Sequence, residues 1–247
     1  MQTVTIDSKW DHEIVLGDDL ISYLKKNNIK SVALFASVQF LDVTTVQKQL
    51  KGLNIIWKTT KAKRTNADMQ ILGCDAYHDS FEVDIISQTD ATLYIGDGMF
   101  HPKALLLSQI YSKKELKPVV IWNPVLNEMQ IITVQDIQAQ IDGLLANLKR
   151  FIGSKTIGIL VTVKPGQQYL NNALKLKDML EKQGKKAYIF IDDDIQLFLL
   201  ENYPFIDAWV NTACPRIGTD DHVTIRKPLI NIREAYDPVA AIGKLIK

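Results

Sequence analysis

The sequence is short of cysteine, of net charge and of long apolar runs. Two cysteines among 247 residues cannot build a disulfide framework, so a reducing cytoplasm is the expected compartment. With 29 Lys and Arg against 28 Asp and Glu, the formal net charge is +1, which argues against direct binding of nucleic acid or anionic membranes. No apolar run approaches the roughly 18 residues of a membrane span, and the first twenty residues are too charged for a signal peptide.

Several common site motifs are also missing. The sequence has no G-x-G-x-x-G and no G-x-S-x-G, and Lys164-Pro-Gly-Gln lacks the glycine spacing and the Lys-Ser/Thr pair of a P-loop. His12, His78 and His222 do not have the spacing of metal ligands. Binding of nucleotide phosphates therefore has little support in the sequence.

Short apolar runs alternate with segments of helical periodicity. Strands are predicted at residues 31–36, 54–57, 70–72, 91–95, 118–122, 156–163, 187–191 and 208–212. Helices are predicted at residues 43–53, 134–151, 167–183 and 193–202. Such alternation is typical of parallel sheets with helices on their faces. We therefore expect an α/β fold with parallel, Rossmann-like sheets.

The two halves of the chain align with each other. Residues 31–38 match residues 156–163 at an offset of 125, and residues 90–95 match residues 207–212 at an offset of 117. The two offsets differ by eight residues, which is the size of one loop change. The sequence therefore predicts two similar domains related by internal duplication, over residues 1–132 and 133–247, with the helix at 134–151 connecting them.

Five loops that follow predicted strands form the candidate site, because open parallel sheets bind ligands at the carboxyl ends of their strands. These loops span residues 37–39, 73–75, 96–102, 164–167 and 213–216. Both cysteines, Cys74 and Cys214, fall in this set, and the duplication leads us to expect them at equivalent strand ends. Simpler interpretations stay open, because a free cysteine is more often a small buried hydrophobe. Likewise, Asp97 could merely cap a helix that Pro102 helps to start.

Six motifs in and around these loops stand out: SVALFASVQFLD at 31–42, QILGCD at 70–75, YIGDGMFHP at 94–102, GILVTVKPGQ at 158–167, VNTACPR at 210–216 and KPLINIRE at 227–234. In order and spacing, they resemble the signatures of the diphthamide synthase family, with the archaeal members nearest. The resemblance implies a 2-(3-amino-3-carboxypropyl)histidine synthase. Such enzymes use a 4Fe-4S cluster and S-adenosylmethionine to transfer a 3-amino-3-carboxypropyl group, by radical chemistry, to a histidine of translation elongation factor 2. They are dimers of three-domain chains, and each domain gives one cysteine to the cluster.

The resemblance also implies roles for particular residues. It makes Cys74 and Cys214 the metal ligands, and His101 and Arg216 the candidate catalytic residues. The cofactor-binding residues that it implies are Gln39, Asp97, Gly98, Lys164, Gly166 and Gln167. For Arg216, a salt bridge between the domains is an alternative of nearly equal weight.

The sequence departs from the family pattern in two places. It starts where the family's second domain starts, so the first domain and its cysteine have no counterpart. Met99 stands where the family usually has arginine, and a thioether cannot supply the same fork of donors.

Three interpretations follow from these departures. The first is a minimal or split synthase in a homo- or heterodimer, whose third cluster ligand comes from a separate first-domain chain, a catalytic partner subunit or a non-cysteine residue. The second is a non-catalytic paralogue that acts as a binding or regulatory subunit. The third is a fragment whose Met1 is not the natural start. The two retained cysteines favour the first.

Overall fold

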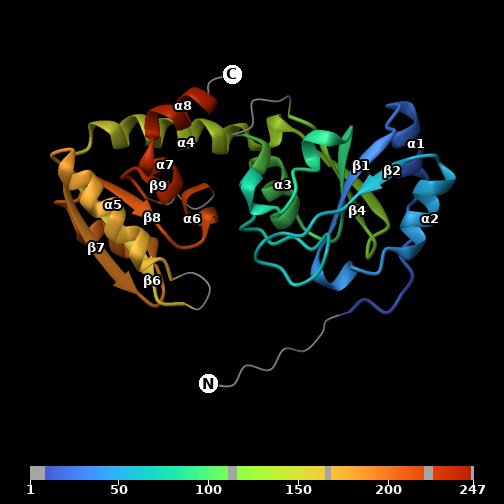
Figure 1. Ribbon diagram of the computed structural model, residues 1–247, viewed down its shortest axis with the longest axis horizontal. Coiled ribbons are helices and arrows are strands. Elements are labelled where there is room, and N and C mark those ends of the chain that lie inside the picture. The colour runs from blue at the N-terminus through green and yellow to red at the C-terminus, as the bar shows by residue number, and fades with distance from the viewer. Residues whose placement is uncertain (1–8, 111–115, 165–167, 220–224, 246–247) are drawn as a thin grey trace. The chain divides into compact units, whose positions relative to one another are not determined.

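A computed structural model describes residues 9–110, 116–164, 168–219 and 225–245 of the chain. The chain divides into two compact units, Met1–Ile137 and Gln138–Lys247 (Figure 1). Both units have the α/β fold with a mainly parallel sheet that the sequence predicts. Within the described ranges, no helix combines the length and the apolar character needed to cross a membrane.

The first unit is built on a five-stranded sheet in the order β2-β1-β3-β4-β5. Its strands are β1 (Ser31–Ala36), β2 (Ile56–Lys58), β3 (Ala91–Ile95), β4 (Val119–Asn123) and β5 (Glu128–Ile132). Its helices are α1 (Asp18–Lys26), α2 (Thr44–Gly52) and α3 (Phe100–Ile110), with 3-10 turns at Val38–Phe40, His78–Ser80, Ile86–Gln88 and Val134–Ile137. Strand β5 runs antiparallel to β4, at an edge position that was not predicted from the sequence.

The buried run of β1 supplies apolar side chains to both faces of this sheet, because successive residues of a strand point in opposite directions. On one face, Leu34 belongs to a core that includes Leu20 of α1 and Leu50 of α2. On the opposite face, the ring of Phe35 lies 5.2 Å from the ring of Phe81. Full burial of each such side chain stabilises the fold by roughly 1.5–3 kcal/mol.

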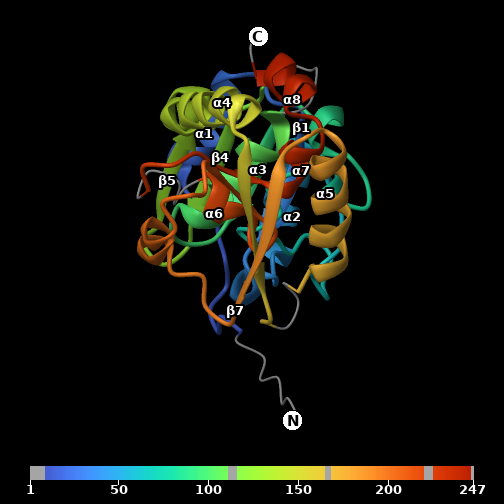
Figure 2. The same ribbon diagram turned by 90° about the vertical axis from the view of Figure 1, so that its left-hand side faces the viewer.

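The second unit is built on a four-stranded parallel sheet in the order β7-β6-β8-β9. Its strands are β6 (Thr156–Thr162), β7 (Lys186–Asp192), β8 (Ala208–Asn211) and β9 (Leu229–Asn231). Its helices are α4 (Gln138–Gly153), α5 (Leu170–Lys182), α6 (Pro215–Thr219), α7 (Ile232–Tyr236) and α8 (Pro238–Leu245), with a 3-10 helix at Leu197–Asn202. Helix α5 packs over β6 and β7, and α8 lies beside α4 (Figures 1 and 2).

Local sequence explains where helices begin and end. Asp18 and Asp19 lie in the first turn of α1 and Lys26 lies in its last turn, where these charges complement the helix dipole. Helix α5 is followed by Gly184, whose φ of +80° lies in the left-handed region that glycine adopts at low cost.

The strand registers of the two sheets are related by the offsets found in the sequence. Ala33 pairs with Thr92 between β1 and β3, and Gly158 pairs with Trp209 between β6 and β8. Position 158 is 125 after 33, and position 209 is 117 after 92. The duplication is therefore present in the backbone pairing as well as in the sequence.

An aspartate before the third strand is repeated in the same way. The Oδ2 atom of Asp90 accepts a hydrogen bond from the backbone N–H of Ser31 at 2.8 Å. In the second unit, Oδ2 of Asp207 accepts one from the backbone N–H of Thr156, also at 2.8 Å. Each carboxylate links the start of one strand to the start of its neighbour within the same unit. The same side-chain hydrogen bond therefore occurs once in each unit.

Two predicted elements need correction. Residues 70–72 do not form a strand, since Gln70 makes only a single bridge to Ala36. The φ of +52° at Met69 interrupts the extended chain there. The predicted helix at 193–202 is reduced to the 3-10 helix at Leu197–Asn202. Its first part is held differently, because the N–H of Asp193 donates to the side chain of the preceding aspartate at 2.8 Å.

Candidate functional site

In the first unit, the cysteine segment lies beside the end of β1. The N–H of Ile71 donates to the carbonyl of Ala36 at 3.2 Å, which aligns the segment with the carboxyl edge of the sheet. Gly73 then packs so closely on Phe100 that a Cβ atom at position 73 would lie 1.8 Å from the ring atom Cε1. The half-buried Cys74 and the first turn of α3 are therefore neighbours.

Asp75 closes the turn that carries Cys74. Its Oδ2 accepts a hydrogen bond from the N–H of Leu72 at 2.8 Å, and its own N–H donates to the Leu72 carbonyl at 3.0 Å. The side chain is buried, and burial raises the pKa of Asp75, while the Leu72 hydrogen bond and the charge of Arg64 oppose the rise. The turn is thus fixed by a carboxyl group that costs less to bury when it carries a proton.

Two substitutions at Asp75 should separate its hydrogen bond from its charge. Asp75→Ala should lower the free energy of unfolding by about 1–2 kcal/mol, because the half-buried Leu72 N–H loses its acceptor. Asp75→Asn keeps an acceptor and removes the buried charge, so at pH 7 it should be at least as stable as the wild type. The pKa of Asp75 in the folded state is raised above its ordinary value of 3.8. Burying the ionised carboxylate therefore destabilises the folded state at neutral pH, and this destabilisation decreases as the pH falls toward 3.8 and the folded state takes up the proton.

Urea unfolding of both variants at pH 7 and pH 4 measures this difference. The advantage of Asp75→Asn over the wild type should be smaller at pH 4. An advantage that grows as the pH falls would show that the assigned direction of the pKa shift is wrong.

His101 lies in the first turn of α3 beside a buried phenol. Its ring stacks on Tyr94 with centroids 6.2 Å apart, and it lies 5.4 Å from the ring of Phe100. Burial raises the pKa of Tyr94 to about 12; the Ser37 hydroxyl opposes this rise and the charge of Asp97 adds to it. The phenol therefore keeps its proton at neutral pH, and His101 has a neutral polar neighbour.

The other predicted residues of the first unit lie in the loops after β1 and β3. Gln39 is half-buried in the 3-10 turn, and its carbonyl accepts a hydrogen bond from the N–H of Trp10 at 2.9 Å. Asp97 and Gly98 are exposed, and Gly98 has a φ of +64°. Helix α3 begins at Phe100, so Met99, and not Asp97, is the residue that directly precedes it, and capping by Asp97 stays a prediction.

In the second unit, two buried asparagines hold the backbone around Cys214. Nδ2 of Asn211 donates to the Cys214 carbonyl at 2.8 Å and to Oδ1 of Asn231 at 2.7 Å. Nδ2 of Asn231 donates in turn to the carbonyl of Pro215 at 2.8 Å. Gly218 faces this pair so closely that a Cβ atom there would lie 2.4 Å from Oδ1 of Asn231. The turn between β8 and α6 thus presents its half-buried thiol from a fixed backbone.

The remaining predicted residues of the second unit differ in their surroundings. Arg216 follows two residues after the cysteine in α6 and is only 6% exposed. Lys164 is exposed at the end of β6, with Nζ 2.6 Å from Oδ1 of Asp194, and this hydrogen bond raises the pKa of Lys164. Gly166 and Gln167 lie outside the described residues.

The two cysteines do not occupy equivalent positions in the duplicated units. Cys74 follows the bridge at Gln70, on the side of β1 where β2 pairs. Cys214 follows β8, which is the counterpart of β3, and the offset of 117 matches it with Asp97. The expectation of equivalent strand ends is therefore wrong, although each cysteine lies at the carboxyl edge of its own sheet.

Comparison with known proteins agrees with the motifs at these two edges. The family model for diphthamide synthesis proteins matches residues 4–238. A 2-(3-amino-3-carboxypropyl)histidine synthase of Pyrococcus horikoshii is 30% identical over 165 residues, which cover 67% of this chain and 44% of the relative. The synthase of Methanocaldococcus jannaschii is 24% identical over 91% of this chain and 57% of its own length. This chain therefore spans about half the length of these curated relatives.

A solved structure shares the fold. The crystal structure of Dph2 from Pyrococcus horikoshii with a 4Fe-4S cluster matches with a TM-score of 0.70 at 24% identity, over 92% of this chain and 61% of the other. The family match extends over nearly all of the sequence, including both cysteine turns and the first turn of α3. This chain belongs to the diphthamide synthesis family.

Proposed function

We propose that this chain is part of a 2-(3-amino-3-carboxypropyl)histidine synthase and holds two of the three cysteine ligands of a 4Fe-4S cluster. In this proposal S-adenosylmethionine is the donor, and a histidine of translation elongation factor 2 is the acceptor. The observation that carries the proposal is the placement of Cys74 and Cys214. Each stands on a turn fixed by hydrogen bonds at the carboxyl edge of a parallel sheet, where such sheets bind ligands.

The two cysteines are the right type of ligand for such a cluster, but the cluster needs three thiolates and the chain supplies two. Thiolates are the ligands that iron–sulfur clusters require, and neither cysteine is part of a disulfide and both are half-buried. Within the described ranges, no group of three or more His, Cys, Asp or Glu residues is arranged to hold a metal ion. We propose that the third thiolate comes from a domain outside these 247 residues, like the first domain of the related synthases.

The remaining residues of the two edges would position the donor and the acceptor. When bound, the reduced cluster would supply the electron that cleaves the sulfonium bond. His101, held against Tyr94, offers a polar group beside the Cys74 turn. Arg216 places a buried positive charge near Cys214, where it would offset the negative charge of a thiolate-ligated cluster. Met99 leaves the start of α3 without the donor fork of an arginine.

A transfer assay tests this proposal. The chain would be reconstituted anaerobically with iron and sulfide, reduced with dithionite, and incubated with carboxyl-labelled S-adenosylmethionine and translation elongation factor 2. The assay would be run with and without the separately produced first domain of the Pyrococcus horikoshii synthase. Label should enter the factor only when that domain is present. His101→Ala should lower the transfer rate at least tenfold, while His78→Ala, at an exposed histidine of the same unit, should leave it unchanged.

The non-catalytic alternative predicts a different result in the same assay. A chain that binds the elongation factor but transfers no label, even with a loaded cluster and the added domain, would be a binding subunit. That result would overturn the proposed activity.

A further inference from the structure

Among the described residues, strand β7 has a long apolar edge on which no further strand of the sheet pairs. It is the outermost strand of the second sheet, and its sequence, KAYIFID, is apolar in its five central positions (Figure 1). Tyr188 is 45% exposed and Ile191 is 56% exposed. Exposed edge strands of this length and hydrophobicity are sites of pairing with another chain unless they are covered or charged.

The backbone of β7 is oriented for such pairing at its odd-numbered residues. The N–H of Lys186 donates to the carbonyl of Lys155 at 2.8 Å, and the carbonyl of Asp192 accepts from the N–H of Val163 at 3.1 Å. The backbone N–H and C=O groups of Lys186 and Asp192, both even-numbered, therefore point toward β6. Because these groups alternate along a strand, the N–H and C=O of Ala187, Ile189 and Ile191 point outward.

The side chains of β7 are complementary to those of a second, antiparallel copy of the same strand. Lys186 and Asp192 lie three residues on either side of Ile189. A two-fold axis at Ile189 therefore sets each lysine opposite the aspartate of the second copy. The same axis sets Tyr188 opposite Phe190 and Ala187 opposite Ile191. Opposite charges and aromatic pairs at facing positions stabilise antiparallel strands, and this match favours a second copy of the chain as the occupant.

We propose that two copies of this chain pair through β7, antiparallel and centred on Ile189. The three outward-pointing residues of each copy would then form hydrogen-bonded pairs, Ile189 with Ile189 and Ala187 with Ile191. The two four-stranded sheets would join into one sheet of eight strands. This inference does not depend on the proposed function.

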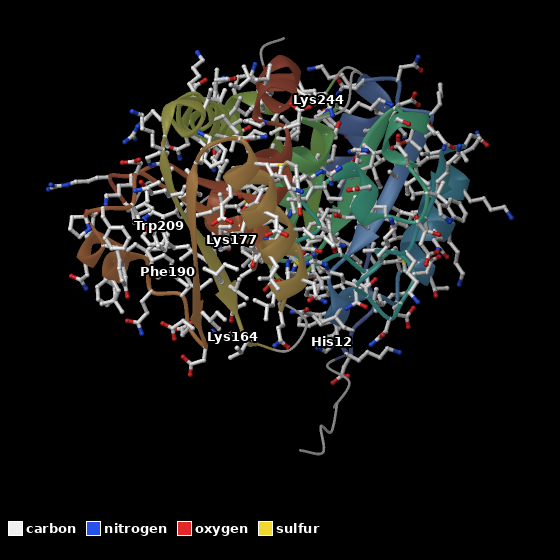
Figure 3. All side chains as sticks on the ribbon, turned by 60° about the vertical axis from the view of Figure 1, so that its left-hand side comes forward. His12, Lys164, Lys177, Phe190, Trp209 and Lys244 are labelled. Carbon is white, nitrogen blue, oxygen red and sulfur yellow. The ribbon has the colours of Figure 1, made fainter. Side chains whose placement is uncertain are left out.

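Aromatic side chains extend the contact on one face of the strand. Phe190 and Trp209 come from neighbouring parts of the second unit (Figure 3), and their ring centroids lie 4.9 Å apart. The ring of Phe190 also lies 4.7 Å from that of Tyr203. Tyr188 lies 5.6 Å from Phe205, which is itself more than half exposed. The pairing would bring Tyr188 of one copy onto Phe190 of the other, so the two aromatic groups would become continuous and lose contact with water.

Charge reversal on the full chain tests the register. Lys186 and Asp192 are both exposed, so their replacement should not disturb folding. Sedimentation equilibrium of the wild type should show a dimer. Lys186→Asp and Asp192→Lys should each weaken it about tenfold, because the symmetry turns two attractive pairs into two repulsive pairs. The double variant should restore the wild-type dissociation constant, because it exchanges the two charges within each pair.

Cysteine cross-linking tests independently whether the two-fold axis lies at Ile189. In Ile189→Cys, the two new thiols face each other across a hydrogen-bonded pair with a Cα–Cα distance of about 5.5 Å, which a disulfide can span. Peptide mapping should find a disulfide between the two copies at position 189 and none at position 191 in Ile191→Cys. The proposal would be overturned by a wild-type chain that stays monomeric at about 100 μM, or by a dimer whose dissociation constant is unchanged in both charge-reversal variants.

Discussion

Replacing Asn231 with alanine is expected to lower the free energy of unfolding of the second unit by about 2–4 kcal/mol. The substitution removes the amide that binds the Pro215 carbonyl and the oxygen that accepts from Asn211. Asn231 is only 3% exposed, so water cannot replace these partners without opening the turn. Each buried group that is left unpaired costs about 1–3 kcal/mol.

Gly218→Ala should disturb the same pair of asparagines, Asn211 and Asn231, by steric crowding. Its new Cβ would lie 2.4 Å from Oδ1 of Asn231, so the amide or the helix has to shift, which should disturb the hydrogen bond from Asn211 to that oxygen. Gly153→Ala is the matched control, because a Cβ atom at position 153, at the end of α4, meets no atom within 4 Å. The control should be as stable as the wild type or slightly more stable, since alanine is favoured over glycine in a helix.

Urea unfolding and amide hydrogen exchange measure the two effects separately. In Asn231→Ala and Gly218→Ala, exchange should accelerate at the N–H groups of Ala213 and Ile217, which bond to Asn211 and to the Cys214 carbonyl. In Gly153→Ala, exchange at both groups should stay unchanged. If Asn231→Ala were within 0.5 kcal/mol of the wild type with unchanged exchange, the asparagine pair would not be what holds the cysteine turn.

The sheet cores were predictable from sequence because burial on both faces produces continuous apolar runs. The runs at 31–36 and 91–95 became β1 and β3 with unchanged bounds. The duplication was predictable because the two halves of the sequence align at two offsets, and the strand registers of the two sheets are related by the same offsets. Strand β5 was missed because exposed and half-buried residues alternate along it up to the buried Ile132, so it does not form a continuous apolar run.

The detail of the two cysteine turns was much less predictable. Asp75, Asn211 and Asn231 stood inside recognised motifs, yet their roles depend on which backbone groups the fold brings within hydrogen-bonding distance. A polar residue at the end of a buried strand was the available signal for Asn211. The position of Cys74 was misjudged because its segment lies on the β2 side of β1, whereas Cys214 follows the counterpart of β3, and no periodicity reveals the order of the strands in the sheet.

Loss of a cluster on replacing either thiol is the second large effect that we expect. Cys74→Ser and Cys214→Ser keep the size of the side chain but replace the thiolate with a hydroxyl group that iron–sulfur clusters do not favour. Neither side chain is fully buried, so both variants should fold. Lys244→Ala, in α8, is the control and should load iron as the wild type does.

The most direct measurement is therefore the iron and sulfide content of the chain, with its electron paramagnetic resonance spectrum, after anaerobic reconstitution together with the added first domain. The wild type and Lys244→Ala should hold one 4Fe-4S cluster per chain, whose spectrum changes when S-adenosylmethionine is added. Cys74→Ser and Cys214→Ser should each lose most of the iron and the signal. A wild-type chain that takes up no cluster, or serine variants that both retain it, would contradict the assignment of these two cysteines as cluster ligands.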